Sequence, residues 1–290
     1  FQMKELGITE CPRDAMQGIQ DWIPTDEKIA YLNSLLKVGF NVLDFGSFVS
    51  PKAIPQLKDT SSVLNSLDLE GTKTELLAIV ANKRGAHDAS SFDEIAYLGF
   101  PFSISEEFQK RNTNKSIEES LKSVEDIKSI ADACGKKVMI YISMAFGNPY
   151  EELWHPDIAV DWSIKLHQKL GIEHIALSDT IGLSNRENIT HLFTEVLSEI
   201  PNVEFGAHLH TTPDSWLEKV DAAFSAGCMN FDGALKGYGG CPMAMDKLTG
   251  NMPTENMIEF FQEKNMIQHF KKGMLEDSLK LSSSIFNKYH

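Results

Sequence analysis

The sequence is poor in cysteine, and the few cysteines it has are widely separated. Four occur in 290 residues, at positions 11, 134, 228 and 241, and no two form a C-x-x-C pair. This spacing excludes a zinc ribbon and gives no reason to expect a disulfide framework. Long hydrophobic runs are also missing, since none approaches the roughly 18 residues of a membrane-spanning helix.

Positive charge is scarce as well. Lys and Arg number 27 against 41 Asp and Glu, a net charge of −14. Nucleic acid is therefore not an expected partner, because binding it needs a basic face. The apolar fraction of 42% and the charged fraction of 23% are typical of globular proteins, and the first residues show no apolar signal region. We expect a cytoplasmic protein with no membrane partner, and Phe1-Gln2 ahead of Met3 resembles an expression-tag remnant.

What the sequence does contain is a repeated order of short apolar runs and segments of helical period. The runs predict strands near 5–11, 41–45, 75–81, 98–103, 137–142, 173–178, 203–209 and 228–232. The periodic segments predict helices near 26–38, 88–96, 116–133, 157–170, 185–199 and 214–226, and a helical tail over 274–288. The clearest helix, 116–133, begins with a capping-box pattern of Ser116 and Glu119.

Alternating strands and helices predict a parallel sheet, closed or open. Eight strands in a chain of this length favour a TIM (β/α)₈ barrel, which typically needs about 250 residues. The alternative is an open, doubly wound sheet, but no glycine-rich phosphate loop follows the first strand. No linker or low-complexity tract divides the chain. We therefore expect residues 3–290 to form one catalytic barrel domain with the helical tail packed outside it.

Active residues of such barrels lie at the carboxyl ends of the strands, and polar groups gather there in this sequence. Alternation along a strand puts His208 and His210 on one face, where two imidazoles can bind one ion. Asp14 follows the first strand, and Asn251 ends the glycine-rich segment after the eighth. One carboxylate, two imidazoles and one amide oxygen suit Mg²⁺ or Mn²⁺ with positions left open for substrate.

Each of these residues also has a structural interpretation when taken alone. The histidines could simply face solvent, and Arg13-Asp14 could be a helix cap with a surface ion pair. Asp44 could accept backbone hydrogen bonds, Cys241 could be a small buried apolar group, and Asn251 could be a turn residue. Their shared position at one rim of the barrel is what favours a metal site.

Several stretches carry a family resemblance. They are "PRDAMQ", "SFVSPKAIPQLKD", "NKSIEES", "SDTIGL", "AHLHTT" and "GYGGCP" followed by "GN". Together they resemble hydroxymethylglutaryl-CoA lyases, members of the DRE-TIM metallolyases, over about residues 7–260. The resemblance implies a TIM barrel that cleaves an acyl-CoA to acetyl-CoA and acetoacetate with a divalent metal, and it suggests a homodimer. The related synthases, which catalyse condensations of α-keto acids, lack the cysteine of the "GGCP" loop. Its presence here favours the lyase branch.

By position, the resemblance implies that Asp14, His208, His210 and Asn251 bind the metal. It implies that Arg13 stabilises an enolate oxygen and that Cys241, on a mobile loop, transfers a proton. A thiol of pKa about 8.5 is mostly protonated at pH 7, as an acid must be. The base that takes the substrate's hydroxyl proton stays open between Asp44, a metal-bound water and the Cys241 thiolate. We expect substrate contacts from four further residues, namely Gln17, Asn82, Tyr141 and Asp179.

The sequence departs from the family pattern at four positions. Asp44 stands where the lyases have Glu, which predicts a lost or water-bridged contact to the site. Gln20 stands where they have a lysine able to face CoA phosphates, Ala176 replaces a serine, and Asn148 replaces a cysteine. Two other functions therefore stay open. One is a lyase or aldolase acting on another 3-hydroxy acid, which need not be a CoA ester. The other is a metal-binding barrel without catalysis.

Overall fold

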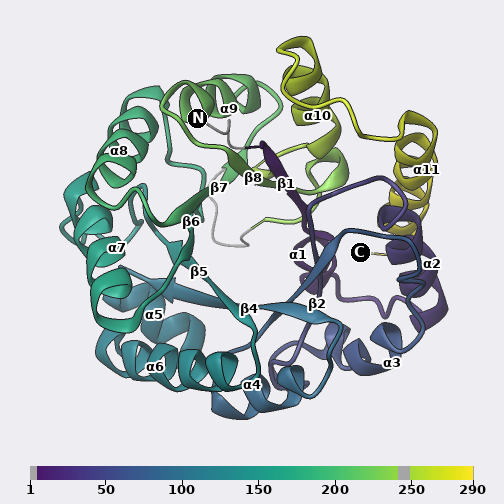
Figure 1. The fold of residues 1–290 in the computed structure, drawn as a ribbon, viewed down its shortest axis with the longest axis horizontal. Coiled ribbons are helices and arrows are strands. Elements are labelled where there is room, and N and C mark those ends of the chain that lie inside the picture. Colours follow the sequence, from purple (N-terminus) through teal and green to yellow (C-terminus); the bar gives the residue numbers. More distant parts are fainter. Residues whose placement is uncertain (1–4, 241–248, 290) are drawn as a thin grey trace.

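The computed structural model describes residues 5–240 and 249–289 of the chain, and its strands form a ring inside a ring of helices (Figure 1). The parallel strands are β1 (Gly7–Glu10), β2 (Val42–Ser47), β3 (Glu75–Ile79), β4 (Ile95–Ser103), β5 (Lys137–Ser143), β6 (His174–Asp179), β7 (Glu204–Thr211) and β8 (Asn230–Gly233). They pair in the order β6-β5-β4-β3-β2-β1-β8-β7, and β6 also pairs with β7. The sheet is therefore closed, which confirms the TIM barrel and excludes the open sheet.

Helices follow the strands; the first, α1 (Pro12–Gln17), lies at the carboxyl end of β1, and the longer helices surround the barrel (Figure 1). The others are α2 (Thr25–Leu35), α3 (Thr60–Leu64), α4 (Lys83–Ser90), α5 (Glu106–Thr113), α6 (Ile117–Ala133), α7 (Pro156–Leu170), α8 (Arg186–Glu199), α9 (Trp216–Ser225), α10 (Thr254–Glu263) and α11 (Lys272–Lys288). Short 3₁₀ turns are η1 (Pro55–Leu57) and η2 (Leu235–Gly237). The capping box of Ser116 and Glu119 at α6 is confirmed. The predicted tail corresponds to α11, which lies on α2 outside the barrel (Figure 1), where Ser278 donates to Ser34 Oγ.

The helix predicted over 88–96 is wrong. The helix in this region is α4, which begins before position 88. Asn82 caps it, because its side chain accepts a hydrogen bond from the Gly85 N–H. Ile95 and Tyr97 instead begin β4 and pair with β3. The apolar side chain of Ile95 fitted a helical period, but the neighbouring strand β3 offered its backbone a partner.

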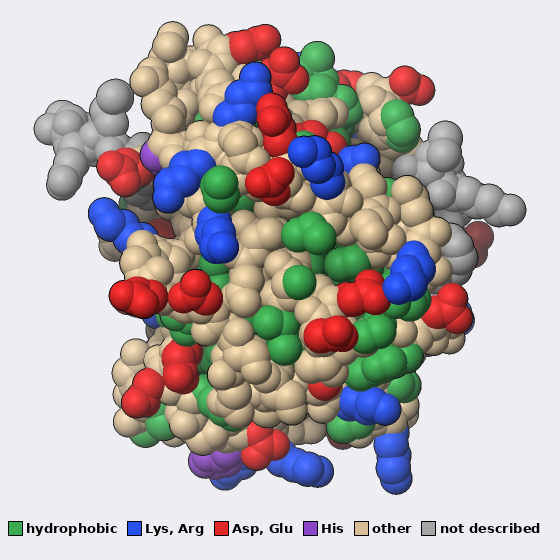
Figure 2. Space-filling view, turned by 90° about the vertical axis from the view of Figure 1, so that its right-hand side faces the viewer, with side chains coloured by type: hydrophobic (Ala, Val, Ile, Leu, Met, Phe, Trp, Pro, Cys, Tyr) green, Lys and Arg blue, Asp and Glu red, His purple; other side chains and the backbone are tan. Residues whose placement is uncertain are grey.

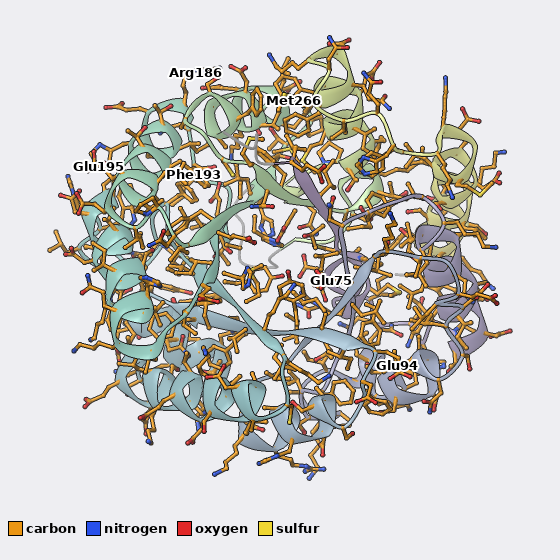
Figure 3. All side chains as sticks on the ribbon, viewed as in Figure 1. Glu75, Glu94, Arg186, Phe193, Glu195 and Met266 are labelled. Atoms are coloured by element: carbon orange, nitrogen blue, oxygen red, sulfur yellow. The ribbon has the colours of Figure 1, made fainter. Side chains whose placement is uncertain are left out.

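The core has a layer between sheet and helices and a second layer inside the barrel. On α8, Phe193 is fully buried and lies between the helix and the sheet, whereas Arg186 points outward (Figure 3). Inside the barrel, Tyr97 packs with apolar side chains of β3, β5 and β6. At the amino-terminal end of the barrel, Lys137 Nζ lies 2.9 Å from Glu75 Oε1 and 3.1 Å from the Tyr97 hydroxyl. These groups close the end opposite to the predicted site.

The outer surface carries both signs of charge. Acidic and basic side chains are interspersed over the face shown in Figure 2, with small groups of hydrophobic side chains between them. Within residues 5–240 and 249–289, no helix has the length and apolar character needed to cross a membrane.

Candidate metal centre and active site

Asp14 reaches the carboxyl end of the barrel because the chain turns into α1 directly after β1. Pro12 begins α1, where a missing N–H costs nothing, and Asp14 lies in the first helical turn. Burial alone would raise the pKa of this carboxyl, but Arg13, His208 and His210 outweigh burial and lower the pKa to about 2. Asp14 is therefore ionised at neutral pH, as a metal ligand must be.

His208 and His210 lie on one side of β7. Their ring centroids are 5.7 Å apart, while Leu209 between them is buried in the main hydrophobic core. Strand alternation thus places the two imidazoles as the sequence predicted.

Each imidazole is oriented by a hydrogen bond at Nδ1. His208 Nδ1 lies 3.0 Å from Asp232 Oδ2, and His210 Nδ1 lies 2.8 Å from the carbonyl oxygen of Thr180. Because both partners are acceptors, Nδ1–H is the donor in each neutral ring and Nε2 keeps its lone pair. This arrangement, with a carboxylate or carbonyl behind each imidazole, is typical of histidines that bind a metal through Nε2.

The same surroundings separate the pKa values of the two rings. Burial would lower the pKa of His208, but the hydrogen bond and charge of Asp232 raise it above its ordinary value. Burial and the neighbouring His208 lower the pKa of His210. His210 is therefore the ring that is more readily neutral and able to bind a cation.

Asn251 is placed by a short strand after the glycine-rich segment. This strand, β9 (Gly250–Asn251), pairs antiparallel with β7, and Asn251 stands opposite His210. Its Nδ2 donates to Asp14 Oδ2 and to the carbonyl oxygen of Tyr238, each at 2.8 Å. Because the amide nitrogen is used in this way, the amide oxygen is the atom with which Asn251 can bind a cation.

The donor set fits a divalent cation. One ligand atom from each of Asp14, His208 and His210 lies within 4.8 Å of the other two, and Asn251 contacts Asp14 directly. The atoms are one carboxylate oxygen and two imidazole nitrogens, with an amide oxygen alongside, which suits Mg²⁺, Mn²⁺ or a similar ion. The structure therefore contains a plausible metal-binding site.

Arg13 lies next to this site and is held by three side chains. Its Nε lies 3.1 Å from both oxygens of Asp44, and its Nη2 lies 2.5 Å from Asp44 Oδ2. Its Nη1 donates to Asp14 Oδ1 at 3.2 Å and to Gln17 Oε1 at 2.7 Å. Nη2 carries two protons, and one is donated to Asp44. The second proton has no acceptor among the residues that the structure describes. It is therefore available for a substrate oxygen.

The expected loss of contact at Asp44 is wrong. The shorter carboxylate reaches the site directly, because it forms a two-point pair with Arg13. Burial would lower the pKa of Arg13, but Asp44 and Asp14 raise it above its ordinary value. Burial raises the pKa of Asp44 in spite of the opposing charge of Arg13. Arg13 is therefore a fixed cation, and Asp44 is its anchor.

Three other residues predicted to contact substrate lie in three separate parts of the barrel. Gln17 is at the exposed rim, where its side chain holds Arg13. Asn82 caps α4 and lines a cavity of about 180 Å³ between α4 and the loop after β2. Tyr141 is buried inside the barrel, with its ring edge against His208 at a centroid distance of 5.5 Å.

Asp179 is engaged by the protein itself. It is 1% exposed, and its oxygens accept hydrogen bonds from the backbone N–H groups of Leu183 and Ser184, from the Ser184 hydroxyl, and from Lys219. These contacts join the loop after β6 to α9. They give Asp179 a structural role, and its predicted substrate contact stays a prediction.

Cys241 lies outside the described residues, as do its neighbours to position 248. The described residues before it pack closely on the metal ligands. Gly239 has φ +88, and a Cβ there would lie 2.7 Å from Asn251 Nδ2 and 2.8 Å from Ala15 Cα. Only glycine fits this position without displacing Asn251.

Of the remaining family departures, two lie in loops and one lies inside the barrel. Gln20 is exposed and bonds to the carbonyl oxygen of Gly18. Asn148 accepts hydrogen bonds from the N–H groups of Tyr150 and Glu152, so its side chain shapes its own loop. Ala176 is buried among the side chains that fill the barrel.

Sequence reasoning missed two buried residues that act on the histidines. The register of β7 and β8 explains why Asp232 lies beside His208. Ala207 pairs with Phe231, and the next residues on the two strands are His208 and Asp232. An acidic residue near the end of a predicted strand was the available signal. Lys219 had no such signal, because it is an ordinary helical lysine in the sequence.

A (β/α)₈ barrel with this donor set at the carboxyl ends of its strands is the arrangement typical of metal-dependent TIM-barrel enzymes. The HMGL-like family model matches residues 8–281, and the chain belongs to this family of carbon–carbon lyases. The hydroxymethylglutaryl-CoA lyase YngG of Bacillus subtilis is 31% identical over 96% of this chain and 90% of its own. The mitochondrial hydroxymethylglutaryl-CoA lyase of Bos taurus is 33% identical over 88% of this chain and 78% of its own.

Solved structures agree with the sequence relatives. The HMG-CoA lyase of Bacillus subtilis superposes with a TM-score of 0.90 at 30% identity, covering 97% of this chain and 93% of the other. An HMG-CoA lyase from Acinetobacter baumannii, in complex with coenzyme A and 3-methylmalate, has a TM-score of 0.88 at 28% identity, covering 98% and 92%. The predicted family is therefore confirmed.

Proposed function

We propose that this protein cleaves 3-hydroxy-3-methylglutaryl-CoA, or a close analogue, to acetyl-CoA and acetoacetate. The observation that carries the proposal is the proximity of Asp14, His208 and His210, whose ligand atoms lie within 4.8 Å of one another beside the Arg13 guanidinium. Family membership and the coenzyme A in a related lyase structure support an acyl-CoA substrate. We assign residues 3–290 to one catalytic unit, with a cytoplasmic location and a homodimeric state as parts of the same proposal.

In this proposal Asp14, His208, His210 and Asn251 hold Mg²⁺ or Mn²⁺. The bound cation supplies Lewis acidity, which lowers the pKa of the substrate's C3 hydroxyl. Asp232 and the Thr180 carbonyl keep the two imidazoles turned toward the site. Asp14 also binds Arg13 Nη1, so the metal ligands and the cationic side chain are positioned by the same carboxylate.

Arg13 stabilises the product enolate. Loss of the hydroxyl proton lets the C2–C3 bond break, and its electron pair moves onto C2 and the thioester oxygen as an enolate. The N–H of Arg13 Nη2 that does not bond to Asp44 donates to that oxygen, and Asp44 keeps the guanidinium in place. A fixed donor at a developing oxyanion typically contributes about 3–4 kcal/mol to transition-state stabilisation.

Cys241 donates the proton that the enolate carbon needs, so that acetyl-CoA is released as the neutral thioester. Asp44 is a weak candidate for the base, because both of its oxygens already accept hydrogen bonds from Arg13. A water or the Cys241 thiolate takes the hydroxyl proton. Asp179 holds the loop after β6 through the N–H groups of Leu183 and Ser184.

The test is a cleavage assay with purified protein and Mg²⁺ or Mn²⁺. 3-Hydroxy-3-methylglutaryl-CoA and free 3-hydroxy-3-methylglutarate are supplied separately, and acetoacetate is measured. We expect acetoacetate from the CoA ester. Product from the free acid alone would identify the related lyase without CoA, and no product from a panel of 3-hydroxy acids and thioesters would identify a barrel without catalysis.

Two pairs of variants separate the metal role from the proton-transfer role. H208A should lose both Mn²⁺ binding and turnover, whereas H191A, which removes an exposed histidine on α8, should keep both. C241A should lose turnover by at least about a hundredfold and keep Mn²⁺ binding. C134A, at an exposed cysteine, is its control. Full Mn²⁺ occupancy in H208A would contradict the ligand assignment.

A further inference from the structure

Lys219 is a buried lysine whose ammonium group lies behind the metal centre. It belongs to α9 and is 4% exposed. Its Nζ lies 3.0 Å from Asp179 Oδ2, 2.8 Å from the carbonyl oxygen of His210 and 3.3 Å from that of Gly182. The three protons of the ammonium group therefore have three acceptors, and one of them is the backbone of a proposed metal ligand.

The carboxylate partner of Lys219 organises the loop after β6. Asp179 accepts from the N–H groups of Leu183 and Ser184, both at 2.8 Å, and from the Ser184 hydroxyl. Thr180 is the first residue of this loop, and its carbonyl oxygen accepts the hydrogen bond from His210 Nδ1. The position of Asp179 thus determines where the acceptor behind the His210 ring lies.

Lys219 therefore acts on His210 by two routes. One is direct, through the His210 carbonyl, and fixes the backbone of β7. The other passes through Asp179 to the Thr180 carbonyl and fixes the orientation of the ring. We propose that Lys219 is a positioning residue for the metal centre, holding His210 in backbone and ring orientation so that Nε2 binds the cation. This inference rests on the ligand set proposed above.

Removing the ammonium group has a defined consequence. Asp179 becomes a buried carboxylate without its cation, and two buried carbonyl oxygens lose a donor. The loop that carries Thr180 and the end of β7 must then rearrange. Loss of a group that orients a metal ligand typically costs 10–100-fold in metal affinity. We expect a loss of about that size for Mn²⁺ in K219M.

Lys28 provides a matched control. It is 1% exposed, and its Nζ also binds one carboxylate, Asp59 Oδ1 at 2.9 Å, and one backbone carbonyl, that of Gln56. Neither partner is a proposed metal ligand. A buried lysine with the same kind of contacts is thereby available away from the metal centre.

The experiment is titration of Mn²⁺ into the metal-free full-length protein by calorimetry, with thermal unfolding of the same samples. Both K219M and K28M should lower the unfolding temperature. Mn²⁺ affinity should fall about 10–100-fold in K219M and stay within about threefold of the wild type in K28M. K219R, which keeps a cationic donor, should recover most of the affinity.

The outcomes distinguish the two levels of inference. Unchanged Mn²⁺ affinity in K219M, or equal losses in K219M and K28M, would overturn the role of Lys219 and leave the ligand set intact. Absence of Mn²⁺ binding in the wild type, or its persistence in H208A, would overturn the ligand set itself. If K219M does not fold, K219Q, which keeps a neutral donor on a side chain one bond shorter, is judged by the same comparison with K28Q.

Discussion

Glu10 should make the stability of this protein fall as the pH rises from acidic to mildly alkaline values. It lies at the end of β1, fully buried, where Oε1 accepts from the Leu235 N–H at 2.8 Å and Oε2 from the Thr254 hydroxyl at 2.5 Å. These two partners flank the segment that carries Cys241. Glu10 therefore ties both ends of that segment to the barrel.

The direction of the effect follows from the pKa. Burial raises the pKa of Glu10 from 4.5 to about 8, although the hydrogen bonds from Thr254 and Leu235 oppose the rise. The folded state then holds a proton that the unfolded chain releases above pH 4.5. The stabilisation is complete below that pH and is lost progressively up to about pH 8.

The magnitude follows from linkage. Each unit of difference in pKa corresponds to about 1.4 kcal/mol. Between pH 5.5 and pH 8.5, a group with pKa 4.5 unfolded and about 8 folded removes about 3 kcal/mol from the free energy of unfolding. Glu255 and Tyr31 interact electrostatically with Glu10, so the difference between the wild type and E10Q includes the effect of the Glu10 charge on these two groups.

The assay is urea unfolding of the wild type and E10Q at several pH values from 5.5 to 8.5. The free energy of unfolding of the wild type should fall relative to E10Q by about 3 kcal/mol across this range. E119Q is the control, because the pKa of the exposed Glu119 is lowered and its carboxylate stays ionised throughout. A wild-type-minus-E10Q difference that does not change with pH would refute the reasoning.

Three further variants test the site directly. D44N should reduce kcat/KM about a hundredfold or more by releasing Arg13, with Mn²⁺ affinity by calorimetry changing less than kcat/KM. G239A should weaken Mn²⁺ binding, because its Cβ would displace Asn251, and equal affinity in the two proteins would show that the loop adjusts freely. D232N should weaken Mn²⁺ binding about 10–100-fold through His208, and an unchanged Kd would exclude this orienting role.

Much of the fold was predictable because it follows from short-range patterns. The strand ending in His208 and His210 is an apolar run with a fixed period, and the helix 117–133 has both its cap and its apolar stripe in sequence. The exception at 88–96 shows the limit of such patterns. Ile95 fits either period, and only pairing with β3 decides for a strand.

The proposed ligands were also identifiable, because a barrel brings the ends of all its strands to one rim. Their orientation was not identifiable. The Nδ1 partners of the histidines come from β8 and from the loop after β6, far from β7 in sequence. The ion-pair partners of Asp44 and Asp179 were not identifiable for the same reason, since Arg13 and Lys219 meet them only across the fold.

The sequence by itself determined the alternation of strands and helices, the chemical nature of the donors and the rim at which they gather, because periodicity and residue type are local properties. Only the tertiary structure decided which nitrogen of each imidazole is free, which carboxylate anchors Arg13 and which lysine lies behind His210. Those choices depend on hydrogen-bond distances between segments far apart in the chain, and such distances exist only once the barrel has closed.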